Sequence, residues 1–167
     1  MNYIIKSACL IFALGILGCN TSKEVKDINL SELMISDIHS AYKDGRFTCE
    51  KLVSAYIKQI EKFDDSINSI SIINPEALSI AKKLDDDYKN TGVLKPLHGI
   101  PLIVKDNINT KGLPTTGGSL ALQDFIPKED AFIIEKLVKA GAIIIAKSNM
   151  AEWAFSAKHT ESSTKGT

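Results

Sequence analysis

A lysine that closes an apolar segment is the first residue here whose type and position could carry chemistry. Lys105 follows Leu102-Ile103-Val104, a run that is typical of a buried strand. Lysines are almost never fully buried unless they are paired, and burial lowers the pKa of an ammonium group until a neutral amine can act as a base. From these residues alone, a surface lysine at a strand exit remains the commoner alternative to a catalytic one.

A hydroxyl nucleophile is the natural partner of such a base, because a hydroxyl attacks poorly until its proton is removed. Serines that could be proposed for this role include Ser119, Ser148 and Ser156. Serine is common in loops and caps, and none of the three is interpreted as part of a glycine-rich oxyanion loop. None is therefore assigned as a nucleophile.

Three segments, in this order and spacing, resemble the first part of the amidase signature family. They are GIPLIVKDNI at 99–108, TTGGS at 115–119 and GAIIIAKSNMAEWAFS at 141–156. The resemblance implies an α/β fold, with a mixed β-sheet covered by helices. It also implies hydrolysis of carbon–nitrogen amide bonds with water, without a metal or an organic cofactor.

The family resemblance further implies a Ser–cis-Ser–Lys mechanism, in which Lys105 matches the general base. The bridging serine and the nucleophilic serine belong to a Gly-Gly-Ser-Ser-Gly-Gly-Ser signature that this sequence lacks. Its last residues, 162–167, resemble the turn that precedes that signature. We therefore expect an N-terminal part of an amidase, incomplete before the Gly/Ser-rich signature. Alone it should be inactive and poorly stable, because strands and apolar faces would stay uncovered.

Other polar residues near Lys105 receive structural interpretations. Asp106 is expected to orient that lysine or to satisfy loop backbone. Lys147 also ends an apolar run, but in the family pattern it belongs to a structural segment and is not expected to be a base. In that segment Glu152 is expected to tie the chain to the rest of the fold, and Trp153 to lie in the core.

The elements that must position these residues alternate between helix and strand patterns, which favours a sheet covered by helices. Apolar residues recur at helical spacing in three early segments and in one late segment, and three short β-prone runs lie between or after them. The expected helices begin after Asn29, Thr48, Asn74 and Asp130, a further short one begins at Ser148, and the expected strands cover 69–73, 102–104 and 142–146.

The N-terminus has the pattern of an export signal. Ser7–Gly18 is an uncharged, mostly apolar run of 12 residues, shorter than the roughly 20 residues that span a bilayer. It ends in Ile16-Leu17-Gly18-Cys19, which resembles a bacterial lipobox and implies lipidation of Cys19. An uncleaved anchor helix is the alternative.

The expected organisation has three parts: a signal peptide at 1–18, a tether at 19–28 after the lipidated cysteine, and the N-terminal part of an amidase signature domain at 29–167. This predicts an exported lipoprotein, held by its lipid to a membrane of the bacterial cell envelope. The substrate class would be a small-molecule or peptide-like amide, bound by the full-length enzyme.

Composition excludes several other classes. Hydrophobic residues make up 44% of the 167-residue chain and charged residues 24%, which is typical of a globular protein. The net charge of +0 shows no basic excess for a nucleic-acid partner, and three cysteines do not make a disulfide scaffold. Two alternatives remain: the amidotransferase subunit that makes amidated transfer RNA, and a non-catalytic lipoprotein on an amidase scaffold.

Overall fold

The computed structural model describes residues 28–155 and 161–164. The expected signal peptide, Cys19 and nearly all of the tether lie outside these residues. The elements, in chain order, are α1 (Ile35–Lys43), α2 (Cys49–Ile67), β1 (Ile70–Ile73), α3 (Ala77–Thr91), β2 (Pro101–Lys105), η1 (Leu120–Leu122), α4 (Phe132–Lys139), β3 (Ile143–Ser148) and η2 (Glu152–Ala154). Within the described part of the chain, no helix is both long and apolar enough to cross a membrane.

The three strands form one mixed sheet in the order β1-β3-β2. The central strand β3 pairs antiparallel with β1 and parallel with β2, so the carboxyl ends of β2 and β3 lie at the same edge of the sheet. At that edge Lys105 is the register partner of Ser148. The expected mixed sheet covered by helices is confirmed.

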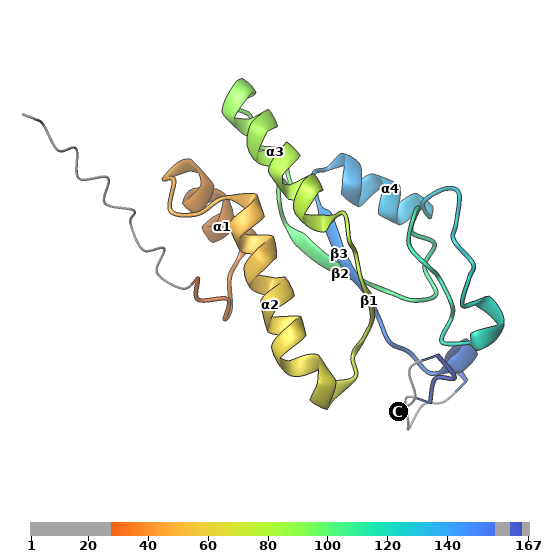
Figure 1. The fold of residues 1–167 in the computed structure, drawn as a ribbon. Coiled ribbons are helices and arrows are strands. Elements are labelled where there is room, and N and C mark those ends of the chain that lie inside the picture. The colour runs from red at the N-terminus through yellow and green to blue at the C-terminus, as the bar shows by residue number, and fades with distance from the viewer. Residues whose placement is uncertain (1–27, 156–160, 165–167) are drawn as a thin grey trace, which may run out of the picture.

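Helices cover both faces of this sheet, with α1, α2 and α3 on one side and α4 on the other (Figure 1). Alternate residues of β3 serve the two faces. Ile143 and Ile145 pack with Leu52 in the larger core cluster, whereas Ile144 packs with Ile134 of α4 in the smaller one. Because both faces are covered, β3 is a continuous apolar run and not an alternating one.

The N-terminus of α2 is capped twice. Thr48 Oγ1 accepts a hydrogen bond from Lys51 N, as its position predicted. The carboxylate of Asp85 in α3 also accepts the backbone N–H groups of Cys49 and Glu50, at 2.7 and 3.0 Å. Asp85 therefore fastens α3 to α2, because a carboxylate is stabilised at the N-terminal end of a helix dipole.

Three other local expectations differ from the structure. The first helix begins at Ile35, because Asn29 accepts the N–H of Ser31 in a turn instead of capping a helix. The helix after Asp130 begins at Phe132, since the Asp130 carboxylate accepts Lys111 N. The short helix expected from Ser148 begins only at Glu152, as the 3-10 helix η2, because Ser148 still belongs to β3.

Candidate active site

The candidate active site lies where β2 and β3 end. The loop at 106–119 follows β2, the segment at 149–155 follows β3, and residues 161–164 return beside them. In sheets with parallel strands, ligands bind at the carboxyl ends, where loops rather than the ladder control which side chains meet. This edge carries all three segments that the sequence resemblance singled out.

Lys105 is the last residue of β2, and its side chain is exposed. Its carbonyl accepts Ile108 N at 3.0 Å and so begins the turn that follows the strand. Within residues 28–155 and 161–164, the Nζ atom has no hydrogen-bond or ion-pair partner. The amine of Lys105 is therefore left open to a group from outside this region, and its role as a base stays a prediction.

The next residue, Asp106, is held at four atoms and is only 1% exposed. Its backbone N–H donates to Ser148 O at 3.2 Å, and its carbonyl accepts Gly117 N at 3.0 Å. Its carboxylate accepts Thr116 Oγ1 at 2.5 Å and, more weakly, Thr116 N at 3.3 Å. Asp106 thus connects the end of β2 to the end of β3 and to the TTGGS segment at 115–119, called the glycine-rich loop below.

Lys147, on β3, is completely buried and faces the same loop. Its Nζ donates to Ile108 O and to Thr115 Oγ1, both at 2.8 Å, and lies 3.6 Å from Asp106 Oδ1. Burial lowers the pKa of this ammonium, and the opposite charge of Asp106 acts against that effect. The sequence interpretation of Lys147 as structural agrees with this geometry, but the ion pair with Asp106 was not foreseen.

The glycine-rich loop approaches the chain after β3 very closely. A Cβ atom at Gly118, which has φ +76°, would lie 2.7 Å from Met150 O and 3.2 Å from Glu152 Cα. The Gly118 carbonyl accepts Ser163 N and Ser162 Oγ, both at 3.0 Å. Only glycine fits here, since both the space and the left-handed backbone exclude a side chain.

Glu152 ties these segments together, as expected. Its Oε1 accepts Ser119 Oγ at 2.5 Å, and its backbone N–H donates to Glu161 O at 2.7 Å. Hydrogen bonds from Ser119 and Ser163 lower the pKa of the Glu152 carboxyl. Ser119 is therefore a loop-fixing residue in this arrangement.

Trp153 does not lie in the core: it is 59% exposed. Trp153 and Ala154 both have left-handed φ angles, 54° and 57°. The Trp153 N–H donates to Gly117 O at 2.9 Å. Two consecutive non-glycine residues with left-handed backbone conformations store strain at the edge of the site, about 1–2 kcal/mol each.

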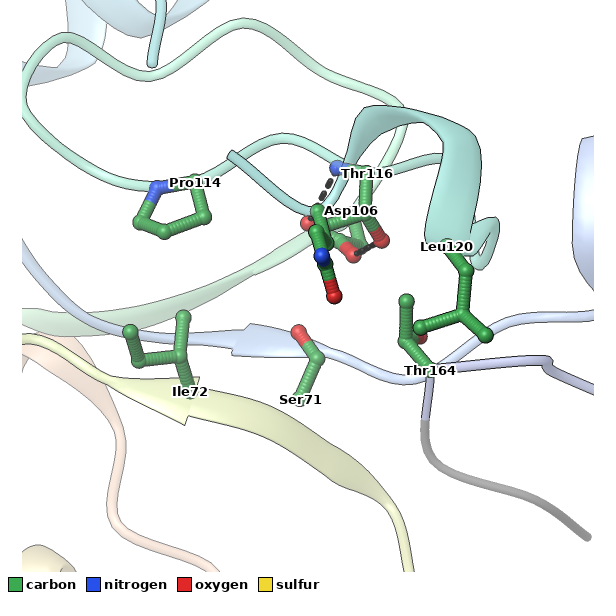
Figure 2. Close-up of a pocket in the computed structure, with 8 residues that line it drawn as sticks. Ser71, Ile72, Asp106, Pro114, Thr116, Leu120 and Thr164 are labelled. Atoms are coloured by element: carbon green, nitrogen blue, oxygen red, sulfur yellow. Dashed lines mark hydrogen bonds between the residues drawn. The ribbon is translucent and has the colours of Figure 1, made fainter. Parts of the chain in front are cut away.

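A pocket of about 250 Å³ opens between β1 and the glycine-rich loop (Figure 2). Its walls combine hydroxyl, amide and carboxylate groups with small apolar surfaces. The lining residues are Ser71, Ile72, Asp106, Pro114, Thr116, Leu120, Gln123 and Thr164. Lys105 is not among them, so the structure places the pocket beside the strand end and not around the lysine itself.

The three candidate serines have different surroundings. Ser148 is the one that the sheet register sets beside Lys105, Ser119 is bonded to Glu152, and Ser156 lies outside the described residues. His98 is buried, with its Nε2 3.1 Å from Leu84 O, and takes no part in this edge of the sheet.

Comparison with known proteins agrees with this architecture. The family model described as Amidase matches residues 51–167. A glutamyl-tRNA(Gln) amidotransferase subunit from Lawsonia intracellularis is 45% identical over 141 residues, which are 84% of this chain and 28% of that protein. A probable amidase from Arabidopsis thaliana is 35% identical over 154 residues, 90% of this chain and 30% of the relative.

Solved structures give the same result. Native peptide amidase from Stenotrophomonas maltophilia has a TM-score of 0.75 and 34% identity, covering 81% of this chain and 29% of its own. An amidase family protein from Bacillus anthracis has a TM-score of 0.74 and 33% identity, covering 81% and 28%. The chain thus spans somewhat under a third of the length of these relatives, and its described fold is part of the amidase signature fold. On the family match and these relatives together, the chain belongs to the amidase family.

Proposed function

We propose that this chain supplies the lysine-bearing N-terminal part of an amidase that hydrolyses carbon–nitrogen amide bonds. Lys105 would be the general base of a Ser–cis-Ser–Lys mechanism, and both serines would come from sequence outside this chain. The observation that carries the proposal is the contrast between the two strand-ending lysines. Lys147 is buried with three partners, whereas Lys105 at the same edge is exposed, and its amine has no partner among residues 28–155 and 161–164.

In the proposed reaction, the amine of Lys105 takes a proton from the bridging serine, which takes one from the nucleophilic serine. The nucleophile then adds to the amide carbonyl, and the carbon–nitrogen bond breaks as the proton returns to the leaving nitrogen. Water hydrolyses the resulting acyl ester by the same proton relay. The base has to stand at a fixed strand end, because general-base catalysis depends on hydrogen-bond reach to the proton that moves.

The substrate class we infer is a small-molecule or peptide-like amide. It is supported by relatives whose names include amidase and peptide amidase. A pocket with hydroxyl, amide and carboxylate groups on its walls suits a ligand with hydrogen-bonding groups.

We also propose that the protein is exported and held to a membrane through acyl chains on Cys19. The support is the sequence pattern alone: a short apolar run that ends in a small residue and a cysteine. Acyl chains at that position would insert into a bilayer without any spanning helix.

The test is amide hydrolysis by the full-length protein, expressed from the complete reading frame that contains this chain. Lys105→Ala should lower kcat/KM by about 100-fold or more, because it removes the base. Lys111→Ala removes an exposed lysine of the following loop and is the matched control. Hydrolysis that survives Lys105→Ala would overturn the assignment, as would an active enzyme whose reading frame has no Gly-Gly-Ser-Ser-Gly-Gly-Ser signature.

The second candidate function is that of a glutamyl-tRNA(Gln) amidotransferase subunit, which the 45% identity to such a protein favours. The two functions are separated by product. An amidotransferase of this kind would amidate mischarged transfer RNA together with its partner proteins, whereas the proposed amidase would release an acid and an amine from a free amide. If the full-length protein does neither, a non-catalytic lipoprotein on the amidase scaffold is the remaining interpretation.

A further inference from the structure

We infer that the buried Asp106–Lys147 ion pair is a positioning device for Lys105, and this inference rests on the proposed function. Asp106 follows Lys105 directly in the chain. Lys147 is the residue before Ser148, the register partner of Lys105. Each member of the pair therefore stands one residue away from the Lys105–Ser148 register pair, and the Lys105 amine has no partner among the described residues.

The contacts of the pair are arranged to hold the end of a strand. Three acceptors surround Lys147 Nζ: Asp106 Oδ1, Ile108 O and Thr115 Oγ1. All three belong to the loop that begins right after Lys105, so one ammonium from β3 fixes both the first turn and the far end of that loop. Figure 2 shows the Asp106 carboxylate bonded to Thr116, which continues this connection.

Stability alone does not account for two charges in this place. Both side chains are almost fully removed from water. Replacing a buried ion pair by uncharged residues is often neutral or stabilising, because the desolvation of two ions offsets their attraction. A buried pair instead specifies one arrangement, since any other leaves a charge unpaired. Here the arrangement that it specifies is the exit of β2, from which Lys105 projects.

The experiment separates positioning from folding in the full-length protein. Asp106→Asn and Lys147→Met each leave one buried charge uncompensated and should lower stability. The double variant leaves no buried charge, so its stability should return toward the wild-type value. We expect kcat to stay about 100-fold down in the double variant with KM within about twofold, because a shift of 1 Å in a reacting group has an effect of this size.

Recovery of kcat together with stability in the double variant would overturn the inference, since it would make the pair merely structural. Thr115→Val is a milder variant that removes one hydrogen-bond acceptor of Lys147 and keeps both charges of the ion pair. A measurable fall in kcat without a change in KM would support positioning. An unchanged kcat would contradict it. Glu135→Gln, which breaks the exposed pair with Lys139, is the control.

The failure of the proposed function looks different. If the wild-type protein hydrolyses no amide, or if Lys105→Ala leaves activity intact, the function fails. Amide hydrogen exchange at Asp106 and Gly117 then decides whether the pair holds the strand end. Faster exchange at both amides in the stable double variant supports the holding role, and unchanged exchange rejects it.

Discussion

The Ser119 hydroxyl donates a 2.5 Å hydrogen bond to Glu152 Oε1 and so joins two segments 33 residues apart. The bond closes the glycine-rich loop onto the chain after β3, next to the close approach of Gly118 and Met150 O. This contact fixes the relative position of two of the three segments that the amidase resemblance singled out.

The first prediction concerns acid stability. Hydrogen bonds lower the pKa of Glu152 in the folded protein, so the folded state binds its proton less readily than the unfolded state. The resulting stabilisation is present above the unfolded value, about 4.3, and is lost as pH falls through the lower folded value. Glu152→Gln should therefore flatten the loss of stability below about pH 5, measured as urea midpoints of the full-length protein.

Ser119→Ala gives the matching variant for this prediction, because it removes the largest cause of the lowered pKa and keeps the carboxyl group. It should flatten the same part of the profile. If the urea midpoints of the wild type and both variants fall in parallel as the pH is lowered, this hydrogen bond does not couple proton binding to folding.

The second prediction concerns His98. Burial lowers the pKa of this imidazole, its Nε2 lies 3.1 Å from Leu84 O, and its Nδ1 has no hydrogen-bond partner in the described structure. The unfolded state therefore takes up a proton at a higher pH than the folded state. This contribution to stability is complete above the unfolded pKa, about 6.5, and declines as pH falls below it.

His98→Gln keeps an N–H donor for the Leu84 carbonyl but cannot be protonated in this range. We expect it to remove part of the decline in stability between about pH 7 and pH 5. Thermal unfolding of wild type and variant at pH 7.5 and 5.5 measures the difference. If the two proteins lose equal stability over this interval, His98 is not the coupled group.

Hydrophobic periodicity predicted the helices and strands well wherever burial decides the outcome. The apolar run at 142–146 became β3, and Gly92 ends α3 in the left-handed conformation expected of a terminal glycine. The second helix also begins directly after Thr48, its N-cap residue, as predicted.

The candidate site was predicted only in part, because long-range partners leave no local pattern. The apolar run before Lys105 and its position at a strand end were visible in the sequence. The sequence did not show that Asp106 is the ion-pair partner of Lys147. A lysine at the end of a fully buried strand does signal that a carboxylate must lie nearby. The sequence also does not indicate that Trp153 is exposed or that Trp153 and Ala154 have left-handed φ angles.

The third prediction tests the proposed lipid anchor. Cys19→Ala should move the full-length protein from the membrane fraction to the soluble fraction of the producing bacterium, since no acyl chain could then be attached. Cys9→Ala, within the apolar run, is the matched control and should leave the distribution unchanged. Membrane association that persists in Cys19→Ala would contradict lipidation at this residue and favour an uncleaved anchor helix.

The fourth prediction compares two glycines with the same backbone and different surroundings. Gly112 and Gly118 have φ angles of +78° and +76°, but a Cβ atom at Gly112 would meet nothing within 4 Å, whereas at Gly118 it would meet Met150 O at 2.7 Å. Gly112→Ala should cost about 1 kcal/mol of unfolding free energy, from backbone strain alone.

Gly118→Ala adds a collision with backbone atoms, and no side-chain rotation can relieve it. It should lower the free energy of unfolding by about 2 kcal/mol more than Gly112→Ala does. Urea unfolding of both variants of the full-length protein measures this difference. Equal costs would mean that the segment after β3 can retreat from the glycine-rich loop. In that case the close approach of Gly118 to Met150 would not be rigid. The hydrogen bond between Ser119 and Glu152 would then not be what holds the two segments together.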